Sequence, residues 1–257
     1  MTSSKTKANR ARGRAPGKSR RSAKRKKATS WRTRIRRLSL IALAAIVLIV
    51  ATPLILTVAY RVELLRPVSM LMLADIVRFR FPERDWIEIE DVPPALLQSI
   101  VMSEDGQFCR HRGVDWGALN LVISDVLEGE RARGASTITM QTVKNLYLWN
   151  SRSFIRKGLE VPLALWFDLV LPKKRIMEIY INIAEWDAGV YGVQAASWTH
   201  FGKPAEFLTA REAALLTVAL PNPHVRDPAT PGPGLSRIAG IVQERVRLYG
   251  ARASCVY

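Results

Sequence analysis

The sequence DVPPALLQSIVMSEDG, residues 91–106, determines how the second half of the chain should fold. Four of its side chains recur at the i, i+3, i+4 and i+7 spacing that makes one face of an α-helix: Leu97, Ile100, Val101 and Glu104. Asp91 can cap the start of this helix ahead of two prolines, and Gly106 ends it. The stretch therefore predicts a helix whose inward face includes a carboxylate.

The helical pattern continues to the end of the chain, whereas patterns of strand alternation are weak throughout. Further helices are expected over 116–128, over 157–170, after Pro172, from the capping box Thr209-Ala-Arg-Glu212 up to Pro221, and over 235–249. These patterns predict an all-α domain.

Residues 38–60 form a run of 23 without a charge. At about 1.5 Å per residue, a helix of this length reaches roughly 34 Å, enough to cross a hydrocarbon core of about 30 Å. A buried core helix and a cleaved signal peptide are the alternatives. A core helix is rarely apolar on every face for so long, and no convincing small-residue cleavage site follows Tyr60. We therefore expect one retained transmembrane helix.

The net charge of +17 is concentrated ahead of that run, because 16 Lys or Arg and no acidic residue lie between Lys5 and Arg37. The rest of the chain carries about +1, the difference between 17 and 16. By the positive-inside rule the basic tail is cytoplasmic, and the chain after about residue 61 lies outside the cytoplasm. A nucleic-acid-binding arm is the alternative, but beside a spanning helix an anchor to anionic lipid is simpler.

We expect five segments along the chain. They are a disordered basic tail (1–37), a transmembrane helix (38–60), a juxtamembrane connector partly in the lipid interface (61–86), a helical domain (87–250) and a C-terminal tail (251–257). Cys109 and Cys255 would face an oxidising compartment, in which disulfides form. The sequence leaves open whether these two cysteines meet.

Glu104 stands where a fourth apolar residue of its helix face would be expected, so it should point to the core or to a cleft. Burial disfavours the charged form of a carboxyl group, which raises its pKa and makes it a better base or acid near neutral pH. A structural Glu paired with a Lys or Arg remains the alternative.

Two further stretches carry polar side chains suited to an anionic ligand. In residues 133–145, a glycine and small hydroxyl residues suit a loop that a ligand approaches closely, although Ser136 and Thr137 could equally cap a helix. Gln141, Lys144 and Asn145 follow and could bind a phosphorylated ligand. In residues 152–160, Arg152, Arg156 and Lys157 precede Glu160 and form either an anion site or a solvated start of a helix.

Together these residues resemble the signatures of the peptidoglycan glycosyltransferases (glycosyltransferase family 51). Residues 104–113 resemble the first signature, E-D-x-x-F-x-x-H-x-G, and GASTITMQTVKN at 134–145 resembles the second. Residues 156–160 and 174–182 are similar to the third and fourth signatures, and residues 189–203 with 211–223 are similar to the fifth region, in the same order. The resemblance implies an all-α, lysozyme-like domain. It also implies the monofunctional form of the family, because no K-T-G triad of a transpeptidase domain follows.

The resemblance implies that lipid II and the growing glycan chain are the substrates, with membrane lipids and cell-wall synthesis or division proteins as further partners and no nucleic acid. Glu104 would be the catalytic base, and Glu160 would assist the departing diphosphate directly or through a divalent cation such as Mg²⁺ or Mn²⁺; no cofactor is required and no metal ligands are assigned. The expected substrate-binding residues are Asp105, Ser136, Thr137, Gln141, Lys144, Asn145, Arg152, Arg156 and Lys157. The resemblance further implies that Phe108 packs and that His111 is a structural hydrogen-bonding group. Glu178, Tyr180 and Asn182 would be mainly architectural, as Asp105 would be if it does not contact substrate.

Two other functions are consistent with parts of the pattern. A lytic transglycosylase or lysozyme-like hydrolase can share the fold and a catalytic Glu, but it needs no cations such as those between Lys144 and Lys157. A membrane scaffold with a degenerate domain is disfavoured because both candidate glutamates are present.

Overall fold

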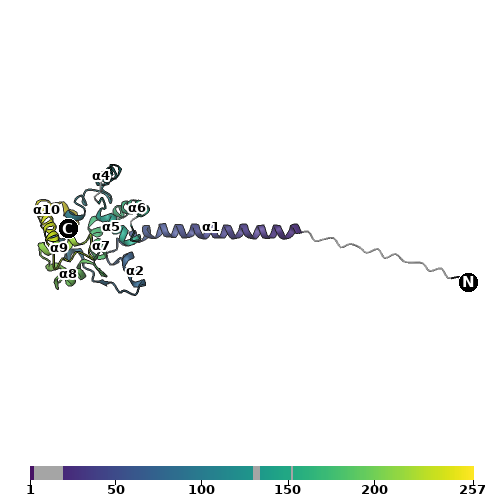
Figure 1. Ribbon diagram of the computed structural model, residues 1–257, viewed down its shortest axis with the longest axis horizontal. Helices are drawn as coiled ribbons and strands as arrows, with labels where there is room; N and C mark the ends of the chain where they lie inside the picture. Colours follow the sequence, from purple (N-terminus) through teal and green to yellow (C-terminus); the bar gives the residue numbers. More distant parts are fainter. Residues whose placement is uncertain (3–19, 130–133, 152) are drawn as a thin grey trace. The chain divides into compact units, whose positions relative to one another are not determined.

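The computed structural model describes residues 1–2, 20–129, 134–151 and 153–257 (Figure 1). It divides into two compact units, Met1–Val50 and Ala51–Tyr257. The first unit contains most of helix α1, Arg20–Ala59, within which Trp31–Ala59 is long and apolar enough to cross a membrane. Only 6% of the most apolar window of that helix is buried in the protein, which excludes the core-helix alternative.

The last turns of α1 belong to the second unit and contact it closely. The Thr57 hydroxyl is buried and lies 3.0 Å from the Tyr147 hydroxyl, and the Trp166 indole N–H donates to the Leu54 carbonyl over 3.3 Å. These contacts support a helix that stays attached to the domain rather than one that is cleaved away.

Helix α1 begins earlier than the sequence pattern indicated. Residues 20–37, expected to belong to a disordered tail, are helical, whereas residues 3–19 of that tail lie outside the described residues. Residues 20–37 are rich in Lys, Arg and Ala, which favour helices, and contain no Gly or Pro. A helix nucleated in the apolar run can therefore extend through them.

The second unit is almost entirely helical, as predicted. Its elements are α2 Met70–Val77, β1 Glu83–Arg84, η1 Ile89–Asp91, α3 Pro94–Glu104, α4 Trp116–Leu127, α5 Ile138–Tyr147, α6 Phe154–Val170, α7 Lys173–Ile183, β2 Glu185–Asp187, β3 Val190–Tyr191, α8 Val193–Phe201, η2 Ala205–Phe207, α9 Ala210–Ala219, α10 Pro233–Tyr249 and η3 Gly250–Val256. The three strands form one sheet in the order β1-β3-β2, with β1 parallel and β2 antiparallel to β3.

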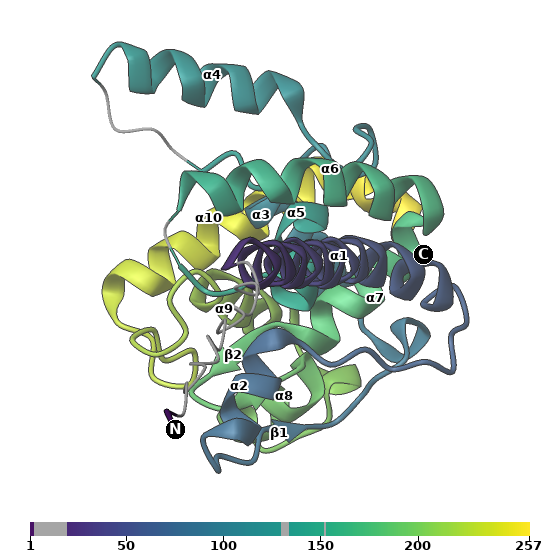
Figure 2. The ribbon, with the colours of Figure 1, turned by 90° about the vertical axis from the view of Figure 1, so that its right-hand side faces the viewer.

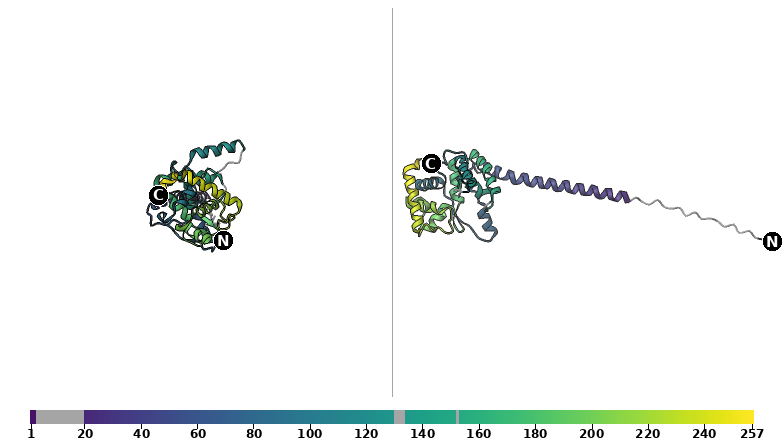
Figure 3. Two further views of the ribbon diagram at one scale, coloured as in Figure 1. Left: turned by 90° about the vertical axis from the view of Figure 1, so that its left-hand side faces the viewer. Right: turned by 45° about the horizontal axis from the view of Figure 1, so that its top comes forward.

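Helix α7 lies at the centre of the second unit (Figure 2). Its expected apolar stripe is buried, and so are Arg175, Glu178 and Asn182, because other elements surround this part of the helix. Each polar side chain has a partner: Arg175 pairs with Glu178 over 2.8 Å, and the Asn182 side chain bonds both backbone groups of Ile87. Helix α5 packs on α6 and α7, and α3 packs on α9 and α10. Helix α4 projects from this body (Figures 2 and 3).

Helix α3 starts later than predicted, and Asp91 is not its cap. Asp91 lies in the short helix η1, while α3 begins at Pro94 with Pro93 in the capping position and no side-chain cap. The residue before a proline is pushed into extended conformation, so Val92 and Pro93 cannot continue a helical turn. The predicted capping box of Thr209 and Glu212 is confirmed at the start of α9.

The C-terminal segment is packed rather than a free tail, which corrects the expected boundary at residue 251. Its helix η3 buries Ala253 and Val256. Cys255 forms a disulfide with Cys109, with Cα atoms 5.6 Å apart, and so resolves the question that the sequence left open. The bridge joins η3 to the segment that follows Glu104.

We predict that the double variant Cys109→Ser, Cys255→Ser unfolds with a free energy about 2–4 kcal/mol lower than that of the parent, because the bridge closes a loop across 146 residues of sequence. Denaturant titration of the solubilised protein measures this difference. Reductant should lower the stability of the parent but leave that of the variant unchanged. Equal stability of variant and parent would contradict the prediction.

Candidate active site

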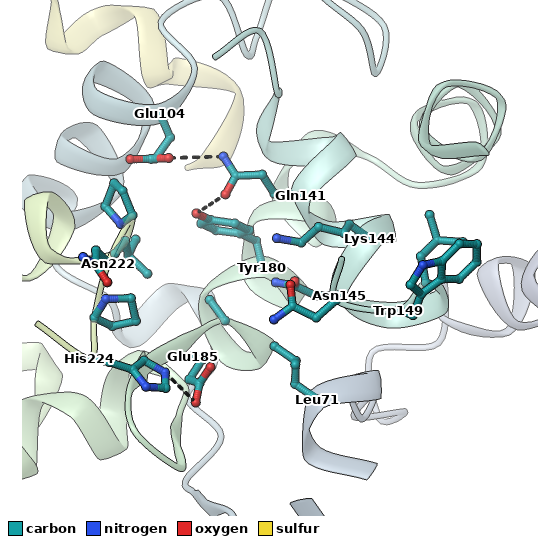
Figure 4. A pocket seen from close by; sticks show the side chains of 16 residues that line it. Leu71, Glu104, Gln141, Lys144, Asn145, Trp149, Tyr180, Glu185, Asn222 and His224 are labelled. Atoms are coloured by element: carbon teal, nitrogen blue, oxygen red, sulfur yellow. Dashed lines mark hydrogen bonds and ion pairs between the residues drawn. The ribbon is translucent and has the colours of Figure 1, made fainter. Parts of the chain in front are cut away.

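A cavity of about 260 Å³ opens beside the C-terminal end of α3, where Glu104 lies (Figure 4). The Gln141 side-chain amide donates to one Glu104 carboxylate oxygen over 3.2 Å, and the Tyr180 hydroxyl donates to the Gln141 carbonyl oxygen over 3.2 Å. The Ser103 hydroxyl donates to the other Glu104 oxygen over 3.3 Å. A hydrogen-bonded chain thus crosses from α3 through α5 to α7 along one wall.

The pKa of the Glu104 carboxyl group is raised, which suits it to accept a proton. Burial raises its pKa above the ordinary value for Glu, and this effect exceeds the opposing hydrogen bonds from Gln141 and Ser103 and the attraction of Arg226. Glu104 forms no ion pair with a Lys or Arg among the described residues, so the structural alternative considered for it does not hold. One buried acid therefore faces a cavity with free space in front of it.

A second wall comes from the face of α5 that contains Gln141, Lys144 and Asn145. The i, i+3 and i+4 spacing places these three side chains side by side, as expected from the sequence. Burial lowers the pKa of Lys144, and the nearby positive charge of Arg156 lowers it further. The cavity thus sets a partly desolvated cation near the carboxylate (Figure 4).

The remaining walls include residues that the sequence did not assign to the site. They come from the ends of α5 and α7 and from the segment after α9: Leu148, Trp149, Asn150, Ala184, Glu185, Leu220, Pro221, Asn222, Pro223 and His224. The His224 ring nitrogen lies 3.2 Å from a Glu185 carboxylate oxygen. Tyr180, expected to be mainly architectural, also lines the cavity. The family resemblance at 211–223 was the signal that covered Asn222, whereas His224 directly follows it.

Asp105 and Thr137, both candidates for contact with substrate, form hydrogen bonds within the fold. The Asp105 carboxylate is buried, lies 2.9 Å from the His111 ring nitrogen and accepts from the Ile138 backbone N–H over 3.0 Å. Thr137 caps α5 by accepting from the Met140 N–H, which confirms the capping alternative. Its hydroxyl donates to the Gly113 carbonyl over 2.6 Å.

The predicted structural roles of Phe108 and His111 are confirmed, since Phe108 is fully buried and His111 bonds Asp105. Gly113 is required at its place, because its φ is +79° and an added Cβ would lie 2.4 Å from the Ala164 carbonyl oxygen. The first signature therefore supplies one cavity residue, Glu104, and a rigid support behind it.

Glu160 does not line the cavity. Its carboxylate is 2% exposed and is paired with Arg156 and, over 2.9 Å, with Lys157. Lys157 also donates to the Ser136 hydroxyl. Burial and the positive charges of Arg156 and Lys144 lower the pKa of Lys157 to about 8, so this cluster is electrostatically connected to Lys144 in the cavity. Arg152 lies outside the described residues.

The described residues hold no group of three or more His, Cys, Asp or Glu side chains placed to bind a metal ion. The carboxylate suggested for a divalent cation, Glu160, is already neutralised by two basic side chains.

The chain combines an apolar helix long enough to span a membrane with a helical domain whose cavity contains a buried Glu and Lys144. Residues 73–246 match the family model described as Transglycosylase. A protein of Rhizobium meliloti (strain 1021) is 50% identical over 228 residues, which are 89% of this chain and 95% of that protein. Relatives from Mesorhizobium japonicum and Brucella suis biovar 1 are 55% and 51% identical over 79% and 88% of this chain, and over 87% and 99% of their own lengths. All three are named biosynthetic peptidoglycan transglycosylase. The chain therefore belongs to the biosynthetic peptidoglycan transglycosylase family, as its motifs indicated.

We predict opposite effects on stability at two neighbouring acids. Asp105→Ala should lower the free energy of unfolding by about 1–3 kcal/mol for each buried donor that it leaves unpaired. Glu104→Gln should leave stability equal or slightly higher at neutral pH, because it removes a desolvated charge. Thermal unfolding of both variants measures the contrast, and a stable Asp105→Ala protein would contradict the supporting role of Asp105.

Proposed function

We propose that this chain lengthens the glycan strands of peptidoglycan by transferring the growing lipid-diphosphate-linked chain onto the 4-hydroxyl of lipid II. The observation that carries this proposal is the buried carboxylate of Glu104 in one cavity with Lys144. Membership of the transglycosylase family supports the same reaction.

The reaction needs a base behind the attacking hydroxyl and positive charge at the leaving group. Glu104 accepts the proton of the acceptor 4-hydroxyl. The oxygen of that hydroxyl then bonds to the anomeric carbon of the donor. The bond from that carbon to the diphosphate oxygen breaks, the configuration inverts, and undecaprenyl diphosphate leaves with the bonding electrons. The raised pKa of Glu104 suits it to take up this proton near neutral pH.

Cations near the cavity would stabilise the charge that develops on the departing diphosphate. Lys144 lines the cavity itself, and Arg156 and Lys157 lie close enough to lower the pKa values of their neighbours. In this proposal Glu160 is a positioning residue, because its paired carboxylate holds the Arg156 and Lys157 side chains in place. Gln141 and Asn145 would position the sugars.

Membrane attachment fits this chemistry because both lipid-linked substrates are confined to the bilayer, where tethering raises the effective concentration of each reactant. We propose that the N-terminus is cytoplasmic and the catalytic domain periplasmic. The excess of basic residues ahead of the span supports this orientation. The disulfide between Cys109 and Cys255 supports it independently, because disulfides persist in oxidising compartments.

Replacing the proposed base tests the function directly. Glu104→Gln should fold normally and polymerise lipid II roughly 10²–10⁴-fold more slowly, since general-base catalysis typically contributes that factor. The assay measures glycan strands formed by detergent-solubilised full chain, with finished glycan offered in a separate reaction. Cleavage of finished glycan without polymerisation would instead support a lysozyme-like hydrolase, and full activity of Glu104→Gln would remove Glu104 from its role.

The dependence of the rate on pH should be bell-shaped. Activity should rise as Glu104 loses its proton, at a pH above that of an ordinary Glu, and should fall as Lys157 loses its charge near pH 8. Lys157→Arg keeps the charge and should shift the descending limb to higher pH. Lys203→Arg, at a lysine that pairs with Glu212 in the α9 capping box, is the matched control. An unmoved descending limb in Lys157→Arg would refute this assignment.

A further inference from the structure

A second cavity, of about 410 Å³, lies beside the candidate active site, and the proposed reaction does not use it. Its walls come from β2, from the end of α8 and from the segment after α9. The lining side chains that can carry a charge are Asp187, His200, His224, Arg226 and Asp227. A cavity in which several such groups converge is typical of a binding site for a polar ligand.

The two cavities are joined at the segment after α9. Pro223 and His224 line both of them. Asn222 lines only the cavity at Glu104, and the Arg226 backbone N–H donates to the Asn222 carbonyl over 3.1 Å, so this segment folds into one turn between the cavities. Figure 4 shows Glu104 and His224 on opposite sides of Asn222. A ligand bound at Glu104 can therefore extend past His224 into the second cavity.

Two carboxylates in the second cavity are open to a cationic ligand. Among the described residues, neither Asp187 nor Asp227 forms an ion pair with a Lys or Arg. Their hydrogen bonds come from neutral groups nearby, such as the backbone N–H groups of Ala188 and Ala229. The Thr230 hydroxyl donates to Asp227 and holds the pKa of that carboxyl below its ordinary range. The side chains of Asp187 and Asp227 are 35% and 51% exposed, so a ligand can reach both.

His200 lies between these two carboxylates and lacks the hydrogen bond that a buried ring nitrogen needs. Its side chain is only 7% exposed. Its Nε2 lies 3.6 Å from an Asp187 oxygen and its Nδ1 lies 3.7 Å from an Asp227 oxygen, and both distances are too long for hydrogen bonds. Nε2 is buried and has no hydrogen-bond partner among the described residues. An unsatisfied polar atom at the wall of a cavity is a second sign that this cavity holds a ligand.

The charges of the second cavity suit a ligand that ends in an ammonium group and a carboxylate. Asp187 and Asp227 can accept hydrogen bonds from the ammonium group. Arg226 is fixed by donating to the Val218 carbonyl over 2.7 Å, and its guanidinium can bind the carboxylate. A diphosphate would be repelled by the two acids. The described residues also offer no group of three or more metal-binding side chains.

We propose that the second cavity is a subsite for the stem peptide of lipid II, where it recognises the peptide residue that ends in a free ammonium group and a carboxylate. The proposal rests on the proposed function, because lipid II enters it as the substrate. With the acceptor hydroxyl at Glu104, the stem would run past His224, which is paired with Glu185 over 3.2 Å. Three extended residues span roughly 10 Å, so the third can lie in the neighbouring cavity.

Binding of a soluble fragment tests the subsite without any turnover. The chain contains three histidines, His111, His200 and His224, so histidine-selective isotope labelling of the detergent-solubilised full chain gives three imidazole groups to follow by NMR. The probe is the disaccharide tripeptide with meso-diaminopimelate as its third residue, and the control probe is the same compound with its terminal amine acetylated. His224→Gln assigns the signals.

The free amine should shift the His200 and His224 signals and bind roughly tenfold more tightly than the acetylated probe, because charge-assisted hydrogen bonds are lost on acetylation. The His111 signal should stay in place, because His111 bonds Asp105 behind the active site. No shift at His200 and His224, equal binding of the two probes, or an equal shift at His111 would overturn the proposal.

Asp187→Asn and Asp227→Asn test the same contact in the enzyme, since each removes a charge and keeps the shape of the side chain. Each should raise KM for lipid II with a free stem amine roughly tenfold, leave kcat unchanged and abolish the preference over acetylated lipid II. Asp85→Asn is the matched control, because Asp85 is exposed and lines neither cavity.

Equal KM values in parent and variants, or a parent that polymerises both forms of lipid II equally well, would overturn the subsite and leave the proposed function standing. A parent that polymerises neither form would refute the proposed function, while the NMR titration would still decide whether the second cavity binds the stem.

Discussion

The buried carboxylate of Asp105 fixes the end of α3, which contains Glu104, against the start of α5. It sits at the N-terminus of α5, where unpaired backbone N–H groups favour a negative charge, and it bonds both the Ile138 N–H and the His111 ring. Glu104 precedes Asp105 directly, so the same contact sets the distance from the Glu104 carboxylate to Gln141 one turn into α5. A structural acid thus positions the proposed base.

The sequence predicted those parts of the fold in which a repeating pattern extends over several turns of a helix. The helices α7 and α10 were predicted because apolar residues recur every three to four positions along their sequences. Glu104 was located correctly in a cavity because it interrupts such a pattern. The strands were missed because two or three residues are too few to show alternation. The start of α3 was misjudged because the prolines displaced it from Asp91.

The roles of polar side chains were harder to predict, because a hydroxyl or carboxylate can serve a ligand or the backbone equally well. Thr137 caps a helix and donates to the Gly113 carbonyl, and Glu160 forms ion pairs with Arg156 and Lys157. Both outcomes depend on which elements pack beside these residues. The wall formed by Asn222 and His224 lies in an irregular segment after α9, where no periodic pattern marks a residue as inward-facing. Tertiary packing, rather than local sequence, decides these positions.

The bridge between Cys109 and Cys255 encloses most of the helices of the domain in one covalent ring. A hydrolytic cut in any exposed turn between those two residues, for example in the connection after α9, would leave both fragments joined through sulfur and packed on the same core. The domain therefore survives a single nick as one particle, and its breakdown requires either a second cut or a reductant.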